Sequence, residues 1–316
     1  MSHGDSIAVA PSLPEAWWRR GALGTWLVVV GLYGGFGLVT LNYHALPWWL
    51  VAPLGGYLVC LHGSLQHEAV HGRPTGIRWL DTLIVFPSLW LYLPFDHYRE
   101  SHLRHHQDQD LTDPRLDPES NYLMPEQWAA LSSFGRWLHR TLRTLAGRMI
   151  LVPIRAVWLT WRTDFPKLLA GDRHMLRLWL PHIPAVAIVL WWVLIVCDIP
   201  FWHYVLFFVY PGIALTVLRS FTEHRPAEKV AERTAIVEAG LLTRILFLGN
   251  NYHALHHRDP WRPWYDLGAV YERERAAILA GNGGCVFRGY REIARRYLFT
   301  VRDGPVHPIL AGGQSD

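Results

Sequence analysis

Four apolar runs, each about as long as a membrane span, alternate with polar segments along the chain. They cover residues 22–41, 48–65, 178–197 and 201–218. An α-helix needs about 20 apolar residues to cross the hydrocarbon core of a bilayer. Within each pair, the two runs are joined by a short turn that holds no Lys or Arg. The pattern predicts an all-α integral membrane protein with two transmembrane helical hairpins, about four spans in all.

Basic residues flank the first hairpin at its outer ends, at Arg19, Arg20, Arg73 and Arg78. Positively charged loops stay on the cytoplasmic side of a membrane, so both ends of each hairpin are expected there. The first run ends without a small-residue cleavage site and is therefore interpreted as a retained span rather than a signal peptide.

The segments between and after the hairpins are less regular. Residues 79–95 are apolar but interrupted by Pro87 and Pro94, which favours a re-entrant or interfacial path over a crossing. Residues 149–161 are apolar with interspersed arginines, a pattern typical of a helix that lies in the headgroup region. Residues 270–299 predict a cytoplasmic pair of helices against the membrane.

One domain is expected over residues 1–316. Its predicted parts are a cytoplasmic tail (1–20), the first hairpin (22–65), a region with two histidine clusters and interfacial helices (66–177), the second hairpin (178–218), and a third cluster with C-terminal cytoplasmic helices (219–316).

Composition supports a membrane protein. Hydrophobic residues make up 51% of the chain and charged residues only 18%, against roughly 25% charge in soluble domains. The net charge of +4 is spread between apolar segments, which fits loops facing anionic lipid and argues against nucleic acid as a partner. The three cysteines are scattered without a CxxC pair, so cysteine chemistry is not expected to carry the function.

Histidines form three clusters that suit metal binding. An HxxxH motif begins at His67, and HxxHH motifs begin at His102 and His253; His224 follows the fourth run alone. Helix positions i, i+3 and i+4 share a face, so each cluster can aim its imidazoles at one point. Nine imidazoles are too many for one metal ion and suit two. The predicted metal ligands are His67, His71, His102, His105, His106, His224, His253, His256 and His257.

The predicted topology brings these ligands together. The first cluster follows the second run, and His224 and the third cluster follow the fourth, so all lie on the cytoplasmic side. The second cluster joins them only if residues 79–95 do not cross. Lone histidines are usually core or surface residues, and this is the interpretation for His44, His62, His97, His139, His174, His182, His203 and His307.

Polar residues close to the clusters can orient the imidazoles by accepting their second N–H. The predicted set is Glu68, Glu223, Asn250, Asp259 and Asp266, with Glu223 and Asp259 favoured because each lies beside a ligand in the sequence. Asp108, Asp110 and Glu238 are weaker candidates by proximity alone.

The three motifs and their order resemble the membrane fatty acid desaturase superfamily, which also includes carotenoid ketolases and hydroxylases. The resemblance runs from about His67 to Asp266 and includes Asn250 before the third motif and Pro260 after it. It implies a di-iron centre held almost entirely by histidine, O2 as co-substrate, a lipid or fatty-acyl substrate and an external electron donor. No appended haem-binding domain is expected. Three cysteines are too few for an iron–sulfur cluster, so a ferredoxin or similar protein is the expected donor.

The leading hypothesis is an O2-dependent fatty-acyl desaturase, because an aliphatic C–H bond needs an oxidant stronger than any side chain. The alternative is a carotenoid or lipid hydroxylase or ketolase on the same scaffold. A membrane metal-binding or transport protein is a remote alternative, because transporters place ionisable ligands inside their spans. Catalytic zinc normally takes three protein ligands, which disfavours a zinc hydrolase. The aromatic stretch 86–95 suits either an acyl channel or core packing.

Overall fold

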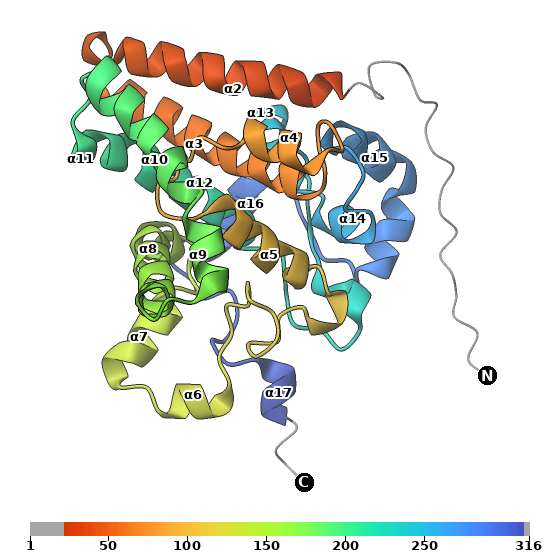
Figure 1. Ribbon diagram of the computed structural model, residues 1–316. Helices are drawn as coiled ribbons and strands as arrows, with labels where there is room; N and C mark the ends of the chain where they lie inside the picture. The colour runs from red at the N-terminus through yellow and green to blue at the C-terminus, as the bar shows by residue number, and fades with distance from the viewer. Residues whose placement is uncertain (1–21, 313–316) are drawn as a thin grey trace.

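The structure is a computed structural model that describes residues 22–312. The predicted N-terminal tail, with Arg19 and Arg20, lies outside the described residues. Within the described part the fold is almost entirely helical (Figure 1). Its two strands, β1 (Ile236–Val237) and β2 (Val286–Phe287), pair in parallel over two residues each. The all-α prediction is therefore confirmed.

The first hairpin packs two long helices side by side along one edge of the molecule (Figure 1). Its elements are α2 (Leu23–Leu41), the 3-10 turn η1 (Tyr43–Ala45) and α3 (Trp48–Val70). The last turns of α3 continue beyond the predicted apolar run, and they carry the first histidine motif.

Each arm of the second hairpin is built from shorter helical stretches that follow one another. They are α9 (Arg173–Trp179), α10 (His182–Leu190) and the π-helix η3 (Trp191–Val196), then α11 (Phe201–Tyr204), the π-helix η4 (Val205–Val209) and α12 (Tyr210–Ser220). Four helical stretches are long and apolar enough to cross a membrane, namely Leu23–Leu41, Trp48–Val70, Arg173–Val196 and Phe201–Ser220. Within the described residues, the four predicted apolar helices are therefore confirmed in length and composition.

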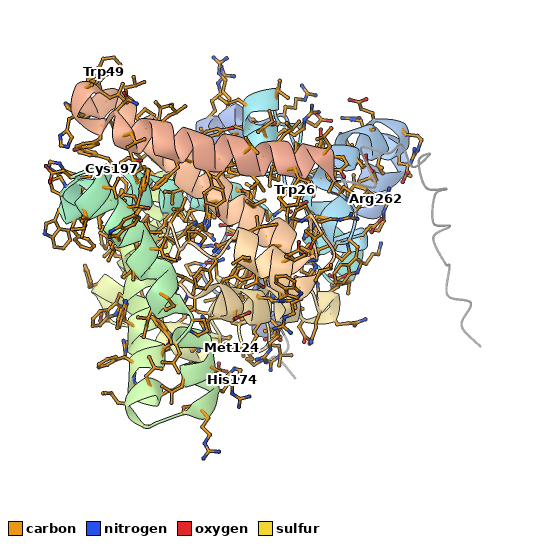
Figure 2. The ribbon with its side chains drawn as sticks, turned by 45° about the horizontal axis from the view of Figure 1, so that its top comes forward. Trp26, Trp49, Met124, His174, Cys197 and Arg262 are labelled. Carbon is orange, nitrogen blue, oxygen red and sulfur yellow. The ribbon has the colours of Figure 1, made fainter. Side chains whose placement is uncertain are left out.

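The turns of both hairpins meet at the same end of the molecule. His44 Nε2 lies 3.2 Å from the carbonyl oxygen of Cys197, and Trp192 Nε1 donates to Thr40 Oγ1 at 2.9 Å. Figure 2 shows Trp49 and Cys197 at this end and Arg262 at the other. The open ends of both hairpins, where the histidine motifs begin, consequently point the same way.

Glycines let α3 and α12 approach closely. A Cβ atom at Gly56 would lie 2.8 Å from Pro211, and one at Gly212 would lie 2.6 Å from Val59. Small residues at such a contact bring helix backbones together in a membrane, where packing rather than hydrophobic burial drives association. This contact sets the distance between the end of α3 and the segment that follows α12.

Residues 79–95 do not cross the molecule as a helix, as predicted. The short helix α4 (Arg78–Ile84) ends before an irregular stretch that leads to α5 (Phe95–His105). This stretch is held between the hairpins: the Tyr33 hydroxyl donates to the carbonyl of Ile84 at 2.6 Å, and the Tyr204 hydroxyl donates to that of Leu89 at 2.9 Å. It returns the chain to the side from which it came.

The remaining helices form a cap over the open ends of the hairpins (Figure 1). In the sequence, the stretch between the two hairpins contains η2 (Asp108–Asp110), α6 (Pro125–Ala129), α7 (Ser133–Thr141) and α8 (Leu145–Leu169). After the second hairpin come η5 (Val230–Arg233), α13 (Leu241–Leu246), α14 (His253–Arg258), α15 (Trp264–Gly281), α16 (Tyr290–Tyr297) and α17 (Pro308–Gly312).

The helix α8 contains the predicted interfacial segment and exposes a row of large apolar side chains. Ile150, Ile154, Trp158 and Trp161 are all more than two-fifths exposed, and they recur every three or four residues. They therefore share one face. Such a face, with Trp among its residues, is typical of a helix at a membrane surface.

We predict that Gly212→Leu destabilises the protein, because the new side chain must push α12 away from Val59. Overpacking of this kind typically costs about 1–3 kcal/mol. The midpoint of thermal unfolding of the purified protein in detergent should fall. Gly31→Leu is the matched control, since no heavy atom lies within 4 Å of the added Cβ. Equal midpoints for the two variants would contradict the proposed role of the α3–α12 contact.

Candidate di-metal centre

The first histidine pair sits at the point where α3 stops. His67 lies in its last turn and His71 is its C-terminal cap residue. The backbone N–H of Arg73 donates to the carbonyl of Glu68, and that of Gly72 donates to that of Ala69, which together make a Schellman motif. Gly72 has φ +76°, a left-handed conformation that favours glycine. The motif ends the helix immediately after its second histidine.

The second and third motifs also occupy helix ends. His102 and His105 lie in the last turn of α5, and His106 is its cap residue. His253 begins the short helix α14, which also carries His256 and His257. His224 follows α12 and is fixed by an isolated antiparallel bridge to Thr234.

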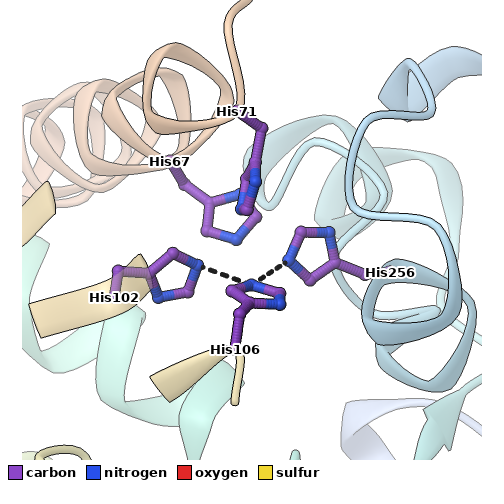
Figure 3. Close-up of side chains that lie close together, drawn as sticks. All are labelled: His67, His71, His102, His106 and His256. Atoms are coloured by element: carbon purple, nitrogen blue, oxygen red, sulfur yellow. Dashed lines mark hydrogen bonds between the residues drawn. The ribbon is translucent and has the colours of Figure 1, made fainter. Parts of the chain in front are cut away.

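All nine predicted ligands converge, and they form two groups. In each group one ring nitrogen from every histidine lies within 4.8 Å of the others. The first group is His67, His71, His102, His106 and His256, shown in Figure 3; the second is His105, His224, His253 and His257. The groups adjoin, because the rings of His106 and His257 stack with centroids 4.4 Å apart.

Nitrogen spacing within the groups suits shared metal ions. Nε2 of His106 lies 3.1 Å from that of His102 and 3.0 Å from that of His256. Nε2 of His224 lies 2.9 Å from that of His105 and 2.9 Å from that of His253. A metal–imidazole bond is about 2.1 Å long, so two nitrogens at right angles about one ion lie about 3.0 Å apart. The donor sets therefore fit metal ions.

Several buried ring nitrogens have no hydrogen-bond partner within the described residues. Nε2 of His67, both ring nitrogens of His71 and Nδ1 of His224 belong to this set. Leaving a buried polar atom unpaired costs about 1–3 kcal/mol. Three of these four atoms belong to the HxxxH pair in the first group, and a metal ion there would use at least two of them.

On the outer side of the groups, the Nδ1 atoms of four histidines contact oxygen acceptors. The pairs are His102 with Glu119 (3.0 Å), His105 with Asp117 (2.8 Å), His257 with Asp108 (2.8 Å) and His253 with Asn250 (2.9 Å). An ionised carboxylate can only accept hydrogen bonds, so Nδ1 carries the proton. Nε2 then keeps a lone pair that points toward the centre and can bind a metal ion. This arrangement is the usual orienting contact of metal-bound histidine.

The protonation states follow from burial. Burial lowers the pKa of His253, His256 and His224 well below the usual value, and neighbouring imidazoles lower it further. These side chains are accordingly neutral, the form that binds metal. His105 differs: burial lowers its pKa, but Glu119 and Asp117 more than offset this and raise it to about 9.

The comparison with known families agrees with this geometry. The model of the fatty acid desaturase family matches residues 43–289, about three quarters of the chain. The chain belongs to the fatty acid desaturase family. This desaturase-family protein is therefore an oxidoreductase associated with membranes and lipid. A search of curated proteins gave no match.

Two of the predicted orienting residues lie against one histidine of this desaturase-family protein. Asn250 Oδ1 lies 2.9 Å from His253 Nδ1, and Asn250 Nδ2 donates to Glu223 Oε1 at 3.3 Å. Glu223 lies 3.5 Å from His253 and pairs with Arg219 at 2.9 Å. Burial raises the pKa of Glu223, an effect that Arg219 opposes. Glu223 and Asn250 therefore support His253 together.

The other three predicted orienting residues lie elsewhere. Asp259 pairs with Arg262 at 2.7 Å rather than with a histidine, so its prediction is corrected: the end of α14 turns its side chain toward the following loop. Glu68 is buried and lies beside the backbone N–H of Trp264 at the start of α15. Asp266 is buried in the first turn of α15.

Asp117 and Glu119 were not among the predicted orienting residues, and Asp108 was only a weaker candidate, yet all three contact a histidine. Asp117 reaches His105 because the loop after η2 folds back, where Asp117 also accepts the backbone N–H groups of Thr112 and Glu119. No short motif marks such a contact. Tyr98, which stacks on His102 with ring centroids 5.4 Å apart, was also missed. Its position four residues before His102 on one helix face was a usable signal.

Within the described residues, the eight lone histidines stay outside both groups. His62 is fully buried in the core beside Tyr33, with ring centroids 6.4 Å apart. His174 is exposed and pairs with Glu100, and His182 Nε2 lies 3.0 Å from the carbonyl of Leu91. These three histidines contact a core aromatic ring, a carboxylate and a backbone carbonyl, respectively, as expected for core and surface residues.

We predict that Asp117→Asn weakens metal binding, because it removes the carboxylate that orients His105. Loss of such a partner typically lowers metal affinity about 10- to 100-fold. Iron titration of the metal-free protein in detergent measures the change. Asp259→Asn is the control and should bind iron like the unmodified protein, since Asp259 pairs with Arg262. Similar losses in both variants would argue against a specific role for Asp117.

Proposed function

We propose that this protein is an O2-dependent di-iron fatty-acyl desaturase. The observation that carries the proposal is the convergence of nine histidines in two adjoining groups. One iron would be held by the group of His67, His71, His102, His106 and His256, the other by the group of His105, His224, His253 and His257. Bound iron would supply the oxidising power that no side chain has.

Iron is favoured over other imidazole-binding metals by the donor set and the family together. Imidazole alone suits Fe, Zn, Cu and Ni. Catalytic zinc normally takes three protein ligands, whereas these groups offer five and four. Members of the fatty acid desaturase family generally use two irons, and two adjoining groups fit that requirement.

The reaction proposed is the removal of two hydrogens from neighbouring methylene groups. Each turnover converts CH2–CH2, O2, two electrons and two protons into CH=CH and two waters. The carbon pair is oxidised by two electrons, and O2 is reduced by four. Two of those four electrons come from the substrate, and an external donor must supply the other two.

A separate redox protein, such as a ferredoxin, is the proposed donor. The three cysteines of this chain are all free, and two of them are buried in the hairpins. They cannot build an iron–sulfur cluster, which takes four protein ligands. Electrons would reach the centre from the side where Asp108, whose side chain is 44% exposed, contacts His257.

A cavity beside the second group offers space for the substrate. It has a volume of about 490 Å³ and is lined by His224 and Tyr98 near the metal groups. Its apolar wall includes Trp90, Leu93 and Leu159. Ligand pockets are typically about 300–1,000 Å³ in volume and mostly apolar. An acyl chain fits such a space.

We also propose that both hairpins are inserted in the membrane as one domain with the metal groups on the cytoplasmic face. Arg73 and Arg78 follow the first hairpin and Arg225 follows the second, whereas the turns at residues 42–47 and 198–200 hold no Lys or Arg. The positive-inside bias supports this orientation. Both metal groups lie at the ends of the hairpins, which disfavours transport.

Expression in a bacterium that lacks this activity, together with a ferredoxin system, tests the function. Mass spectrometry of the cell lipids should show fatty acyl chains lighter by two hydrogens. Oxygenated lipids without new double bonds would instead indicate a hydroxylase or ketolase and would refute the desaturase proposal.

We predict that His102→Ala abolishes product formation and lowers bound iron, because the first metal group loses one of its donors. Membrane-extracted protein should still be recovered at a normal level. His44→Ala is the control, since His44 lies in the hairpin turn against Cys197 and should be nearly silent. Full activity of the His102 variant would exclude His102 as a metal ligand.

A further inference from the structure

The cavity beside the metal groups is unusually rich in guanidinium groups. Its lining includes Arg143, Arg148, Arg155, Arg219 and Arg302. A second, smaller cavity of about 70 Å³ adjoins it and shares Arg143, Arg148 and Arg155. A purely apolar acyl chain gives no physical reason for so many positive charges around its binding space.

Three of these arginines are neutralised by acidic side chains. Arg219 pairs with Glu223 at 2.9 Å. Arg302 pairs with Asp303 at 2.8 Å, and Arg143 forms an ion pair with the same carboxylate. Asp303 therefore serves two guanidinium groups. The cavity is also lined by Asp117 and Glu119, which contact His105 and His102. Its unpaired positive charge therefore comes from Arg148 and Arg155, which form no ion pair within the described residues.

Arg148 is buried without an anionic partner. Its side chain lies in the first turn of α8 and the residue is only 7% exposed. No acidic residue of the described chain forms an ion pair with it, and its buried Nε has no hydrogen-bond partner. Its guanidinium carbon lies 5.9 Å from the centroid of the Phe221 ring, a cation–π contact. Burial, with the nearby charges of Arg143 and Arg302, lowers the pKa of Arg148 to about 9.

The helix α8 arranges charge and apolar surface along the cavity. Arg148, Val152, Arg155, Ala156 and Leu159 all line it, and their spacing puts them on one helix face. The face runs about 16 Å from Arg148 to Leu159 at 1.5 Å per residue. It begins at an unpaired cation and ends with small and large apolar side chains, an arrangement that matches an amphiphile with an anionic end.

We propose that this cavity binds the anionic end of the lipid substrate, a carboxylate or phosphate on an apolar chain, with Arg148 as its principal ligand and Arg143 and Arg155 beside it. The identity of this ligand as the substrate rests on the proposed function, whereas its binding does not. A guanidinium group offers two parallel N–H donors that match a carboxylate or phosphate. An anion would also relieve the cost of the unpaired buried charge.

Binding of three probes with the same chain length tests this proposal. They are palmitate, hexadecyl phosphate and the neutral hexadecanol, each radiolabelled and added to the purified full-length, iron-loaded protein in neutral detergent. No electron donor is present, so no turnover occurs. We expect at least one anionic probe to bind about tenfold or more tightly than hexadecanol. Tighter binding of palmitate would indicate a carboxylate, and tighter binding of hexadecyl phosphate a phosphate headgroup.

Arg148→Gln should weaken the preferred anionic probe about 10- to 100-fold, as expected for the loss of a hydrogen bond to a charged group. Its affinity for hexadecanol should stay within about twofold. Arg162→Gln is the matched control, because Arg162 lies on the same helix, is exposed and does not line the cavity. If Arg148→Gln does not fold, Arg155→Gln, at a half-buried site on the same face, should still weaken the anionic probe several-fold.

Two results would overturn the proposal. One is hexadecanol binding to the unmodified protein as tightly as both anionic probes, a comparison that needs no variant. The other is an anionic affinity that is unchanged in a folded Arg148→Gln protein. These outcomes are separate from the proposed function: a protein that binds palmitate through Arg148 but never yields unsaturated or oxygenated lipid would refute the desaturase assignment alone.

Discussion

The fold depends on the cost of gathering nine desolvated imidazoles at one place. Buried nitrogen atoms without partners are unfavourable. Contacts of these rings with one another and with flanking acceptors take the place of water. The chain meets this cost by placing the ligands of the three motifs at helix ends or in a short helix, and by fixing His224 with a backbone bridge to Thr234. The Schellman motif after His71 is the clearest case, because it stops α3 immediately beyond its second ligand.

Convergence follows from the packing of α3 against α12. Glycines on both helices bring their backbones together. The end of α3 and the segment that carries His224 therefore lie at the same end of the hairpins. The irregular stretch between α4 and α5 then returns the chain to the same side and delivers His102 and its neighbours. If this stretch crossed the bilayer as a helix, the second motif would lie about 30 Å from the other two.

The helical hairpins and the eight histidines of the three motifs could be predicted because their signals are local, whereas His224 was predicted from its place after the fourth apolar run. Apolar runs of sufficient length, basic flanks and i, i+3, i+4 spacing are readable over a few residues. Asp117 and Glu119 were not predictable by this route, since their approach to His105 and His102 depends on how a loop folds back. Asp259 shows the reverse error: it neighbours His257 in sequence, yet the turn after α14 directs it to Arg262.

The position of the centre at the ends of the spans reconciles two opposing requirements. For the proposed desaturase reaction, an apolar chain must arrive from the lipid, while electrons and protons must arrive from water. Trp90, Leu93 and Leu159 line the cavity beside the metal groups, and the part-exposed carboxylate of Asp108 contacts His257. A site deeper in the bilayer would make the orienting carboxylates costly to bury, and one further out would expose the substrate's apolar chain. The guanidinium groups of α8 lie at this boundary, where a lipid's polar and apolar parts meet.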